Sequence, residues 1–353
     1  MLMTKRIKIR SSLQSLTPYS SARKEYSGAA RILLDANENS FGSVLDDELR
    51  RYPDPYQLKL KQKLSGILGI ESRCILLGNG SDEIVDLTVR LFCEPKDDCV
   101  VICPPTFAMF KVQATISSVN VKEVPLRSDF SLDIEALLSA LDAKDRLLFL
   151  CSPNNPTGNL IPVEQIARLL KEFTGIVVLD EAYIDFAPDD SAQFLLKQFN
   201  NLIILRTFSK AWGLAGIRLG AALASAEIVE LLNSIKLPYN INSLTQGQAL
   251  RALEHEAQMK EFVKRICEQR KLLVSNLSKL ACVSRVFPSD ANFLLVQFFD
   301  VSRVKSLLDA QGIIVRDRSQ VKGCEGCLRI TVGNESENER LLLALSELEP
   351  ERP

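Results

Sequence analysis

Residues 202–220 read LIILRTFSKAWGLAGIRLG, an apolar run of strand length followed by a polar turn and small residues. A similar apolar run ends at Asp180 within residues 176–183, IVVLDEAY. Short, continuously apolar runs of this kind indicate strands that are buried on both faces, as in parallel sheets. The two stretches therefore favour an α/β protein in which polar residues follow the ends of buried strands.

Apolar runs of strand length alternate with longer amphipathic stretches from about residue 73 to residue 236. The expected strands are Cys74–Leu77, Cys99–Cys103, Val119–Val124, Leu147–Cys151, Ile176–Leu179, Leu202–Leu205 and Leu219–Ala222. The expected helices include Glu83–Phe92, Ile134–Leu141, Val163–Phe173 and Ile228–Ile235. This pattern predicts a large α/β domain with a mostly parallel sheet flanked by helices.

The pattern changes after residue 244. Residues 244–280 are mostly helix formers and predict one or two linking helices. A smaller α+β pattern follows, with expected strands Phe293–Phe298, Ile313–Arg316 and Leu328–Val332 and expected helices Val301–Ala310 and Asn338–Leu348. Ser336 and Glu339 have the spacing of a capping box for the last helix. We therefore divide the chain into an N-terminal arm that partly joins the small domain (1–40), a large domain (41–249) and a small domain (250–353).

The composition is that of an ordinary globular protein. The 353 residues suit about two domains, and 46% of them are hydrophobic. The formal net charge of −1 gives no basic excess for nucleic acid or an anionic membrane. Apolar runs fall short of the ~18 residues that a membrane span needs. We expect neither nucleic acid nor a membrane as a partner.

The nine cysteines predict reduced thiols rather than disulfides. The N-terminus is basic but has no apolar segment of the secretory type, so a cytoplasmic protein is favoured over one with a transit peptide. Cys324 and Cys327 have C-x-x-C spacing, yet no second pair exists, so a tight turn is favoured over a metal or redox site. His255 is the only histidine and lies in an acidic, helix-like stretch. Proton chemistry is therefore expected from other side chains or from a cofactor.

Four strand ends are followed by distinctive polar residues, at the edge where open α/β sheets bind ligands. The first strand leads into residues 78–82, GNGSD, and a helix start, which suit an anion. Residues 152–158, SPNNPTG, follow another strand and are otherwise a turn-rich loop. Asp180 ends a third strand. The alternative to a ligand-binding role is a structural one, in which its side chain caps the next turn.

Lys210 follows the fourth strand and has uncharged, small or apolar neighbours, which favour partial burial and a lowered pKa. Such a lysine is a candidate nucleophile for Schiff-base chemistry. Asn155 and Asp180 are 25 residues apart and Asp180 and Lys210 are 30 apart, close to one strand–helix–strand unit each. An anion cradle, a carboxylate, an amide, a phenol and an amine at one sheet edge suit pyridoxal phosphate.

The motifs SPNNPTG, LDEAY and TFSKAWGLAGIRLG resemble those of fold-type I pyridoxal-phosphate aminotransferases. Within that superfamily the chain is most similar to the histidinol-phosphate aminotransferases, through residues 16–25, 34–39, 51–55, 78–83, 103–110, 312–317 and 328–333. The resemblance implies a ping-pong transamination in histidine biosynthesis. L-Histidinol phosphate gives its amine to pyridoxal 5'-phosphate and leaves as imidazole-acetol phosphate, and 2-oxoglutarate leaves as L-glutamate.

The resemblance also implies a role for each matching residue. Lys210 binds the cofactor covalently and moves a proton between the substrate Cα and C4′ of the cofactor, and Asp180 pairs with the pyridine nitrogen. Asn155 and Tyr183 bond to the 3-oxygen of the ring. Phe107 stacks on the ring, at a position where family members often have tyrosine.

The remaining roles concern anions. The phosphate of the cofactor is held by Gly80, Ser81, Ser209 and Arg218, with Asp82 nearby. Tyr52 reaches it from a second subunit, which implies a homodimer. Arg329 is the main anion contact of the substrate, and Asn155, Arg316 and Tyr19 assist. For Arg316 the alternative to substrate binding is that residues 316–318 are simply the charged end of a strand.

Other functions remain open from the sequence. A lyase of the same fold, such as threonine-phosphate decarboxylase, has a similar lysine motif and a phosphorylated substrate. An aromatic amino acid aminotransferase would not require that phosphate. A non-catalytic, aminotransferase-like regulator is disfavoured because Lys210 is present and no basic or helix-turn-helix segment precedes the fold. The residues that recognise the imidazole ring are not indicated by any motif.

Overall fold

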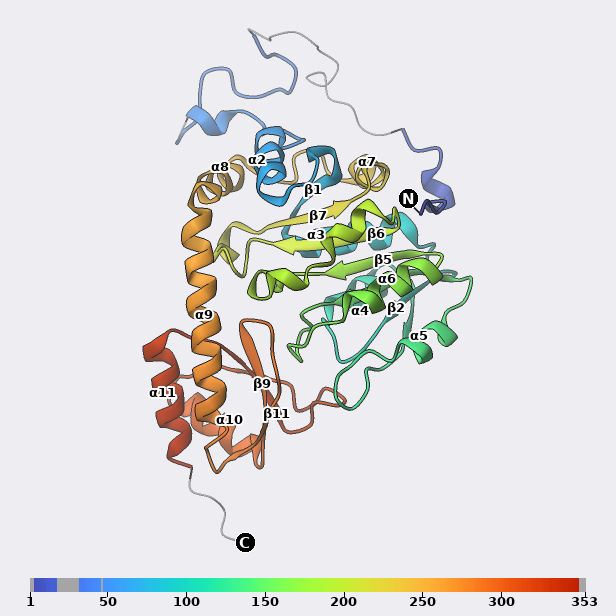
Figure 1. Ribbon diagram of the computed structural model, residues 1–353. Coiled ribbons are helices and arrows are strands. Elements are labelled where there is room, and N and C mark those ends of the chain that lie inside the picture. The colour runs from blue at the N-terminus through green and yellow to red at the C-terminus, as the bar shows by residue number, and fades with distance from the viewer. Residues whose placement is uncertain (1–2, 18–31, 46, 349–353) are drawn as a thin grey trace.

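The computed structural model describes residues 3–17, 32–45 and 47–348, and its largest element is a seven-stranded sheet (Figure 1). The strand order is β1-β7-β6-β5-β4-β2-β3. The bounds are β1 Ile75–Asn79, β2 Cys99–Ile102, β3 Asn120–Glu123, β4 Asp145–Cys151, β5 Ile176–Asp180, β6 Leu202–Thr207 and β7 Leu219–Ala224. Only β7 runs against its neighbours, β1 and β6. The predicted, mostly parallel α/β sheet is therefore confirmed.

Helices cover both faces of this sheet because successive strand residues point to opposite sides. In β5, Val177 and Leu179 face one core and Ile176 and Val178 face the other. The first core is covered by α2 Leu58–Leu68, α5 Ile134–Ala140, α6 Val163–Glu172 and α8 Ser243–Ala252. The second is covered by α3 Gly80–Phe92, α4 Met109–Ile116 and α7 Ala226–Ile235.

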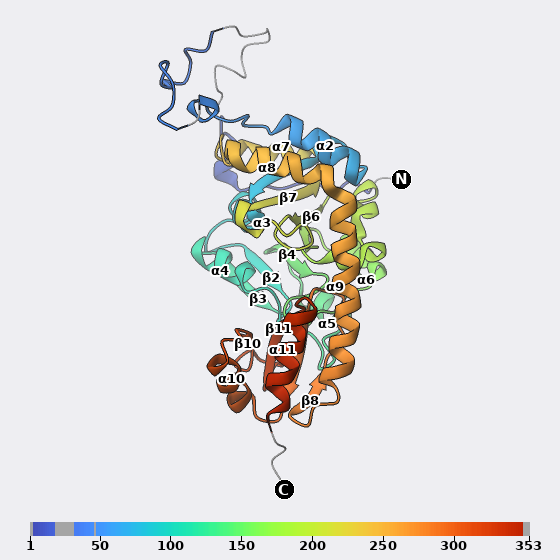
Figure 2. The same ribbon diagram turned by 90° about the vertical axis from the view of Figure 1, so that its left-hand side faces the viewer.

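A second sheet of four antiparallel strands forms the small domain, in the order β10-β11-β9-β8. Its strands are β8 Val283–Val286, β9 Phe293–Phe298, β10 Arg316–Asp317 and β11 Cys327–Thr331, and its helices are α10 Val301–Ala310 and α11 Glu335–Ser346. The long helix α9, Glu256–Leu277, runs from the large domain along the small one (Figure 2). The strand β8 was not expected, because its half-exposed residues lack an apolar pattern.

The capping box predicted at Ser336 and Glu339 is wrong by two residues. Helix α11 begins at Glu335, and Asn334 is its N-cap. The Asn334 side chain accepts a bond from the Glu337 N–H, and the Glu337 carboxylate accepts one from the Asn334 N–H. Asparagine caps a helix as well as serine does, and the strand ends early enough for Asn334 to take that position.

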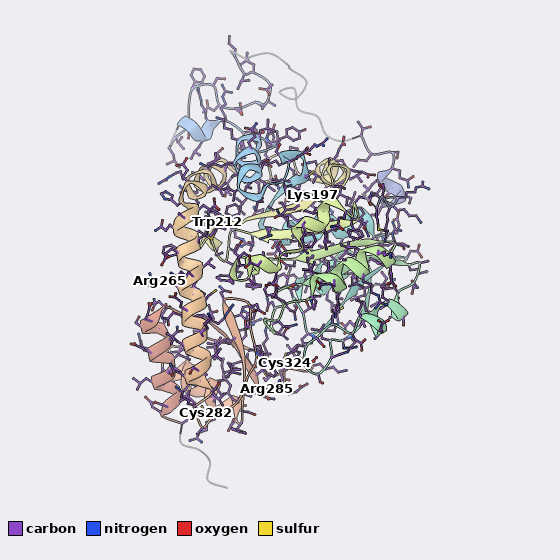
Figure 3. All side chains as sticks on the ribbon, in the orientation of Figure 1. Lys197, Trp212, Arg265, Cys282, Arg285 and Cys324 are labelled. Atoms are coloured by element: carbon purple, nitrogen blue, oxygen red, sulfur yellow. The ribbon has the colours of Figure 1, made fainter. Side chains whose placement is uncertain are left out.

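The cysteines have the free thiols and the local turn that the sequence predicts. All nine cysteines are free thiols, and Cys282 and Cys324 are seen in the small domain (Figure 3). The Cys327 N–H donates to the Cys324 oxygen at 3.0 Å, which confirms the predicted turn. Burial raises the pKa of the Cys327 thiol to about 12 and that of the Cys324 thiol to about 11.

His255 is exposed between α8 and α9. In the described part of the chain, no helix has the length and apolar character to cross a membrane.

Candidate functional site

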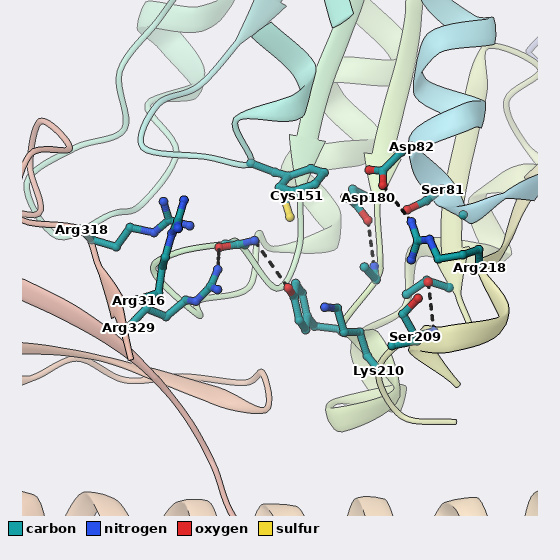
Figure 4. A pocket seen from close by; sticks show the side chains of 17 residues that line it. Ser81, Asp82, Cys151, Asp180, Ser209, Lys210, Arg218, Arg316, Arg318 and Arg329 are labelled. Carbon is teal, nitrogen blue, oxygen red and sulfur yellow. Dashed lines mark hydrogen bonds and ion pairs between the residues drawn. The ribbon is translucent and has the colours of Figure 1, made fainter. Parts of the chain in front are cut away.

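A cavity of about 440 Å³ lies at the carboxyl ends of the parallel strands and reaches the small domain (Figure 4). The strands β4, β5 and β6 end at this edge, and the small domain adds residues from β10 and β11. The lining residues are Gly80, Ser81, Asp82, Phe107, Cys151, Asn155, Asp180, Ala182, Tyr183, Thr207, Ser209, Lys210, Ala215, Arg218, Arg316, Arg318 and Arg329. Of the predicted site residues that the structure describes, the cavity brings together all except Tyr52.

Asp180 ends β5 with its side chain only 4% exposed. Its carboxylate accepts a hydrogen bond from the Ala182 N–H at 2.9 Å, so the capping alternative is realised as well. The pKa of Asp180 is raised to about 7, chiefly by burial; the Ala182 bond and Lys210 oppose this rise, and Asp82 and Glu181 contribute to it. A cation placed against this carboxylate would therefore be strongly stabilised.

The raised pKa of Asp180 predicts a pH-dependent stability difference in the cofactor-free protein. Unfolded Asp180 ionises near its ordinary pKa of 3.8, whereas the folded carboxyl keeps its proton up to about pH 7. Stability is therefore lost as pH rises from about 4 to 7 and is constant above. Asp180→Asn removes this loss, so its unfolding free energy relative to wild type should rise by about 1–3 kcal/mol between pH 5 and pH 8. Urea unfolding at both pH values measures this, and an unchanged difference would contradict it.

Lys210 follows β6 and lines the cavity, where the residue stays accessible to solvent while its amine is partly desolvated by its surroundings. Its Nζ lies 5.5 Å from the centre of the Tyr183 ring. Desolvation and then Arg329 lower the pKa of the amine, with a smaller contribution from Arg218, while Asp180 and Asp82 oppose them. A lowered pKa increases the unprotonated fraction of the amine, which is the nucleophilic form.

A hydrogen-bonded chain joins the two domains beside Lys210. Arg329 donates to Asn155 Oδ1 at 2.5 Å, and Asn155 Nδ2 donates to Tyr183 Oη at 3.5 Å. Tyr183 also packs edge-on against Phe293 of β9, with ring centres 5.0 Å apart. The phenol, the amide and the guanidinium therefore hold one another in position at the cavity wall.

The opposite wall of the cavity is an anion cradle. Gly80 starts α3 with φ +74°, and its N–H donates to the Arg218 oxygen at 2.9 Å. Arg218 adopts φ +52° and its guanidinium lies 3.2 Å from Asp82 Oδ2. Backbone N–H groups at a helix start and an arginine are the groups that bind a phosphate. Ser209, whose N–H donates to Thr207 Oγ1 at 3.1 Å, lies beside them.

The cradle depends on close backbone contact with β7. A Cβ at Gly220 would lie 2.3 Å from Ser81 N and 2.5 Å from Gly80 C. Gly220→Ala should therefore displace the cradle, reduce the unfolding free energy by about 1–3 kcal/mol and weaken the binding of an anionic cofactor roughly tenfold. Gly216→Ala is the control, because no atom lies within 4 Å of its Cβ. Thermal unfolding and cofactor titration test this, and equal behaviour of both variants would refute it.

Phe107 lines the cavity and belongs to a loop that is bonded to a neighbouring loop. Asn154 Nδ2 donates to the Pro105 oxygen at 2.8 Å and to Thr157 Oγ1 at 2.7 Å. Thr106 Oγ1 donates to Asn154 Oδ1 at 3.0 Å. These bonds join the loop that follows β4 to the loop that follows β2, so they position Asn155 and Phe107 together.

Two predicted residues are not among those that line the cavity. Tyr52 is outside the cavity, 50% exposed, and stacks on Tyr239 with ring centres 4.5 Å apart. Tyr19 lies outside the described residues.

The cavity also contains residues that the sequence analysis missed: Cys151, Ala182, Thr207, Ala215 and Arg318. Cys151 and Thr207 end β4 and β6, so the rule that ligands bind beyond strand ends could have indicated them. Arg318 is two residues after Arg316, and alternation along a strand places such residues on one face. Ala182 and Ala215 have no chemical signal in the sequence.

The residues present fit pyridoxal phosphate. A glycine at a positive φ and a guanidinium form a phosphate cradle that a side chain at residue 80 would fill, since a Cβ there meets Arg218 at 2.7 Å. A buried carboxylate with a raised pKa lies across the cavity and suits a protonated ring nitrogen. The amine of Lys210 lies in the same cavity.

Comparisons with known proteins agree with this chemistry. The family model for aminotransferase class I and II matches residues 27–345. A histidinol-phosphate aminotransferase of Cytophaga hutchinsonii is 49% identical over 334 residues, which cover 95% of this chain and 96% of that protein. The histidinol-phosphate aminotransferase structure from Clostridium acetobutylicum has a TM-score of 0.79 at 28% identity, over 85% of this chain and 91% of the other. The enzyme from Sinorhizobium meliloti, solved with pyridoxal-5'-phosphate, has a TM-score of 0.78 at 28% identity, over 88% of this chain and 89% of the other.

Proposed function

This chain belongs to the aminotransferase class I and II family, and on that premise we propose that it is a histidinol-phosphate aminotransferase that uses pyridoxal 5'-phosphate. It transfers the amino group of L-histidinol phosphate to 2-oxoglutarate, giving imidazole-acetol phosphate and L-glutamate in histidine biosynthesis. The observation that supports this most directly is one cavity that holds Lys210, Asp180 and a group of arginines.

Pyridoxal phosphate, when bound, supplies an aldehyde for the amino group and a ring that accepts electrons from the substrate Cα. Lys210 would supply the amine that holds the cofactor, and its unprotonated form would take the proton from the substrate Cα and deliver it to C4′ of the cofactor. Asp180 keeps a proton on the ring nitrogen by electrostatic attraction. Asn155 and Tyr183 orient the ring oxygen, and Phe107 covers one face of the ring.

The anion-binding residues lie on two sides of the cavity. Gly80, Ser81, Ser209 and Arg218 bind the phosphate of the cofactor, with Asp82 orienting Arg218 through their ion pair. Arg329 binds the phosphate ester of the substrate from the opposite wall, with Arg316, Asn155 and Tyr19 assisting. Arg329 in turn donates a bond to Asn155, so the residues assigned to the substrate anion and to the ring oxygen contact each other.

Amine transfer is tested by a panel of donors with 2-oxoglutarate. Histidinol phosphate should give glutamate without release of carbon dioxide, and a phosphorylated donor should react far better than the matching alcohol. Carbon dioxide release from threonine phosphate would support the lyase instead. Equal rates with aromatic amino acids lacking a phosphate would support an aromatic aminotransferase.

We propose further that the protein is a homodimer in which Tyr52 binds the cofactor phosphate of the partner subunit. Residues 32–58 include large apolar side chains that are exposed on this chain, and Phe41 and Val44 are completely so. Apolar surface of this extent favours association with a second copy. We also propose a cytoplasmic location, supported by nine free thiols, and domain boundaries near residues 40 and 249.

Mixed dimers test the role of Tyr52. Lys210→Ala and Tyr52→Ala subunits, each poorly active alone, should form a heterodimer with one intact site when Tyr52 acts across the interface. At limiting cofactor we expect each heterodimer to have about the activity of one wild-type site. This activity would be several-fold above that of either parent variant. Activity no higher than the Tyr52→Ala parent, or a monomer in sedimentation, would contradict this arrangement.

A further inference from the structure

Three arginines lie on one face of the β10–β11 pair. Arg316 and Arg329 are directly opposite each other in the antiparallel register. The Arg318 N–H donates to the Cys327 oxygen at 3.0 Å, so the pairing continues one step beyond β10. Residues two apart on a strand share a face. Arg318 therefore joins the other two arginines on the cavity wall that faces Arg218 (Figure 4).

This cluster of positive charge lacks a counter-ion among the described residues. No carboxylate in that part of the chain forms an ion pair with any of the three, and the Arg329 side chain bonds to the neutral Asn155. The Nε of Arg318 is buried and has no partner there either. Desolvation and then the neighbouring Arg329 and Arg316 lower the pKa of Arg318. Like charges opposite one another destabilise a sheet, so the arrangement favours a bound anion of more than one charge.

Arg318 is also held in place by its own loop. The Val321 N–H donates to the Arg318 oxygen at 2.8 Å, and the turn from Cys324 to Cys327 closes the loop. Both cysteines are buried in an apolar cluster with Phe130 and Phe287. The C-x-x-C turn therefore anchors the backbone that presents Arg318 to the cavity.

We propose that Arg318 is a specificity-determining residue, which together with Arg316 and Arg329 selects the phosphate ester of the amine donor over a carboxylate. This inference rests on the proposed function and extends it. A phosphate ester near neutral pH has close to two negative charges and three acceptor oxygens. A carboxylate has one charge and two oxygens, which one arginine fork satisfies. The third guanidinium thus matters for the phosphorylated donor and little for 2-oxoglutarate.

Steady-state kinetics of the Arg318→Gln holoenzyme test this proposal. The KM for histidinol phosphate should rise about 10- to 100-fold, the effect of one charge-assisted hydrogen bond. The KM for the amino acceptor, 2-oxoglutarate, and kcat/KM for unphosphorylated histidinol should stay within about twofold of wild type. Arg318→Lys keeps the charge and should recover part of the loss. Arg340→Gln, an exposed arginine of α11, is the matched control and should behave as wild type.

Inorganic phosphate provides a probe that does not depend on turnover of the donor. It should compete with histidinol phosphate in wild type and in Arg340→Gln, and about tenfold more weakly in Arg318→Gln. Cofactor affinity and thermal midpoint show whether the variant is folded, and Arg318→Lys gives the comparison if the glutamine variant is not. The role of Arg318 would be overturned if KM rose equally for the amino acceptor, or if the values for histidinol phosphate and phosphate were unchanged. Wild-type protein that forms no glutamate from histidinol phosphate would instead overturn the proposed function.

Discussion

Lys210→Ala is expected to lower the transamination rate by about 10⁴-fold or more, because in the proposed mechanism the variant loses both the covalent anchor of the cofactor and the base that moves the Cα proton. The amine lies in the cavity with Asp180 and Arg218, and no other lysine lines that cavity in the described structure. Stopped-flow measurement of glutamate formation gives the rate. Borohydride reduction followed by peptide mapping should mark Lys210 in wild type and leave no mark in the variant.

Two variants separate the chemistry of Lys210 from its charge. Lys210→Arg keeps a cation in the cavity but cannot bond to the aldehyde, so its rate should be as low as that of Lys210→Ala. Lys197→Ala removes an exposed lysine of the large domain and should leave the rate unchanged. Substantial activity in Lys210→Arg, or a borohydride mark on another residue, would show that a different amine holds the cofactor.

Asp180→Asn is expected to have the second largest effect, a loss of about 10³-fold in kcat, because an amide cannot keep the ring nitrogen protonated. The buried carboxylate accepts a backbone hydrogen bond from Ala182, and its proposed cationic partner is the protonated ring nitrogen of the cofactor. The same substitution should stabilise the cofactor-free protein above pH 7, where the wild-type carboxylate is charged and buried. Loss of activity combined with gain of apoprotein stability distinguishes a functional charge from a structural one.

Asp189→Asn, on the exposed turn after Tyr183, is the control for this substitution and should change neither quantity. Asp180→Glu keeps the charge but lengthens the side chain, and it should retain more activity than the amide. A kcat of Asp180→Asn within tenfold of wild type would contradict the assigned pairing with the ring nitrogen. The urea titrations of the apoproteins also show whether each variant unfolds cooperatively, as a folded protein does.

Much of the large domain follows from local sequence. Each buried strand is a short apolar run, and the period-two distribution of residues such as Val177 and Val178 onto two cores makes the strands recognisable without tertiary information. The positions of Asp180 and Lys210 follow from the same pattern, because parallel strands place their carboxyl ends at one edge. Their spacing by one strand–helix–strand unit was therefore sufficient to predict that these residues lie close together.

Other features depend on contacts between residues that are distant in sequence. The wall of arginines exists because the small sheet aligns Arg316 with Arg329 and the Cys324 turn presents Arg318, and no local pattern encodes that register. The need for glycine at residue 220 arises from its close approach to Ser81, which only chain packing reveals. Local periodicity thus determines which segments are buried and which ends meet, since it follows from backbone geometry. Tertiary structure decided which charges face one another, since that depends on the packing of two domains.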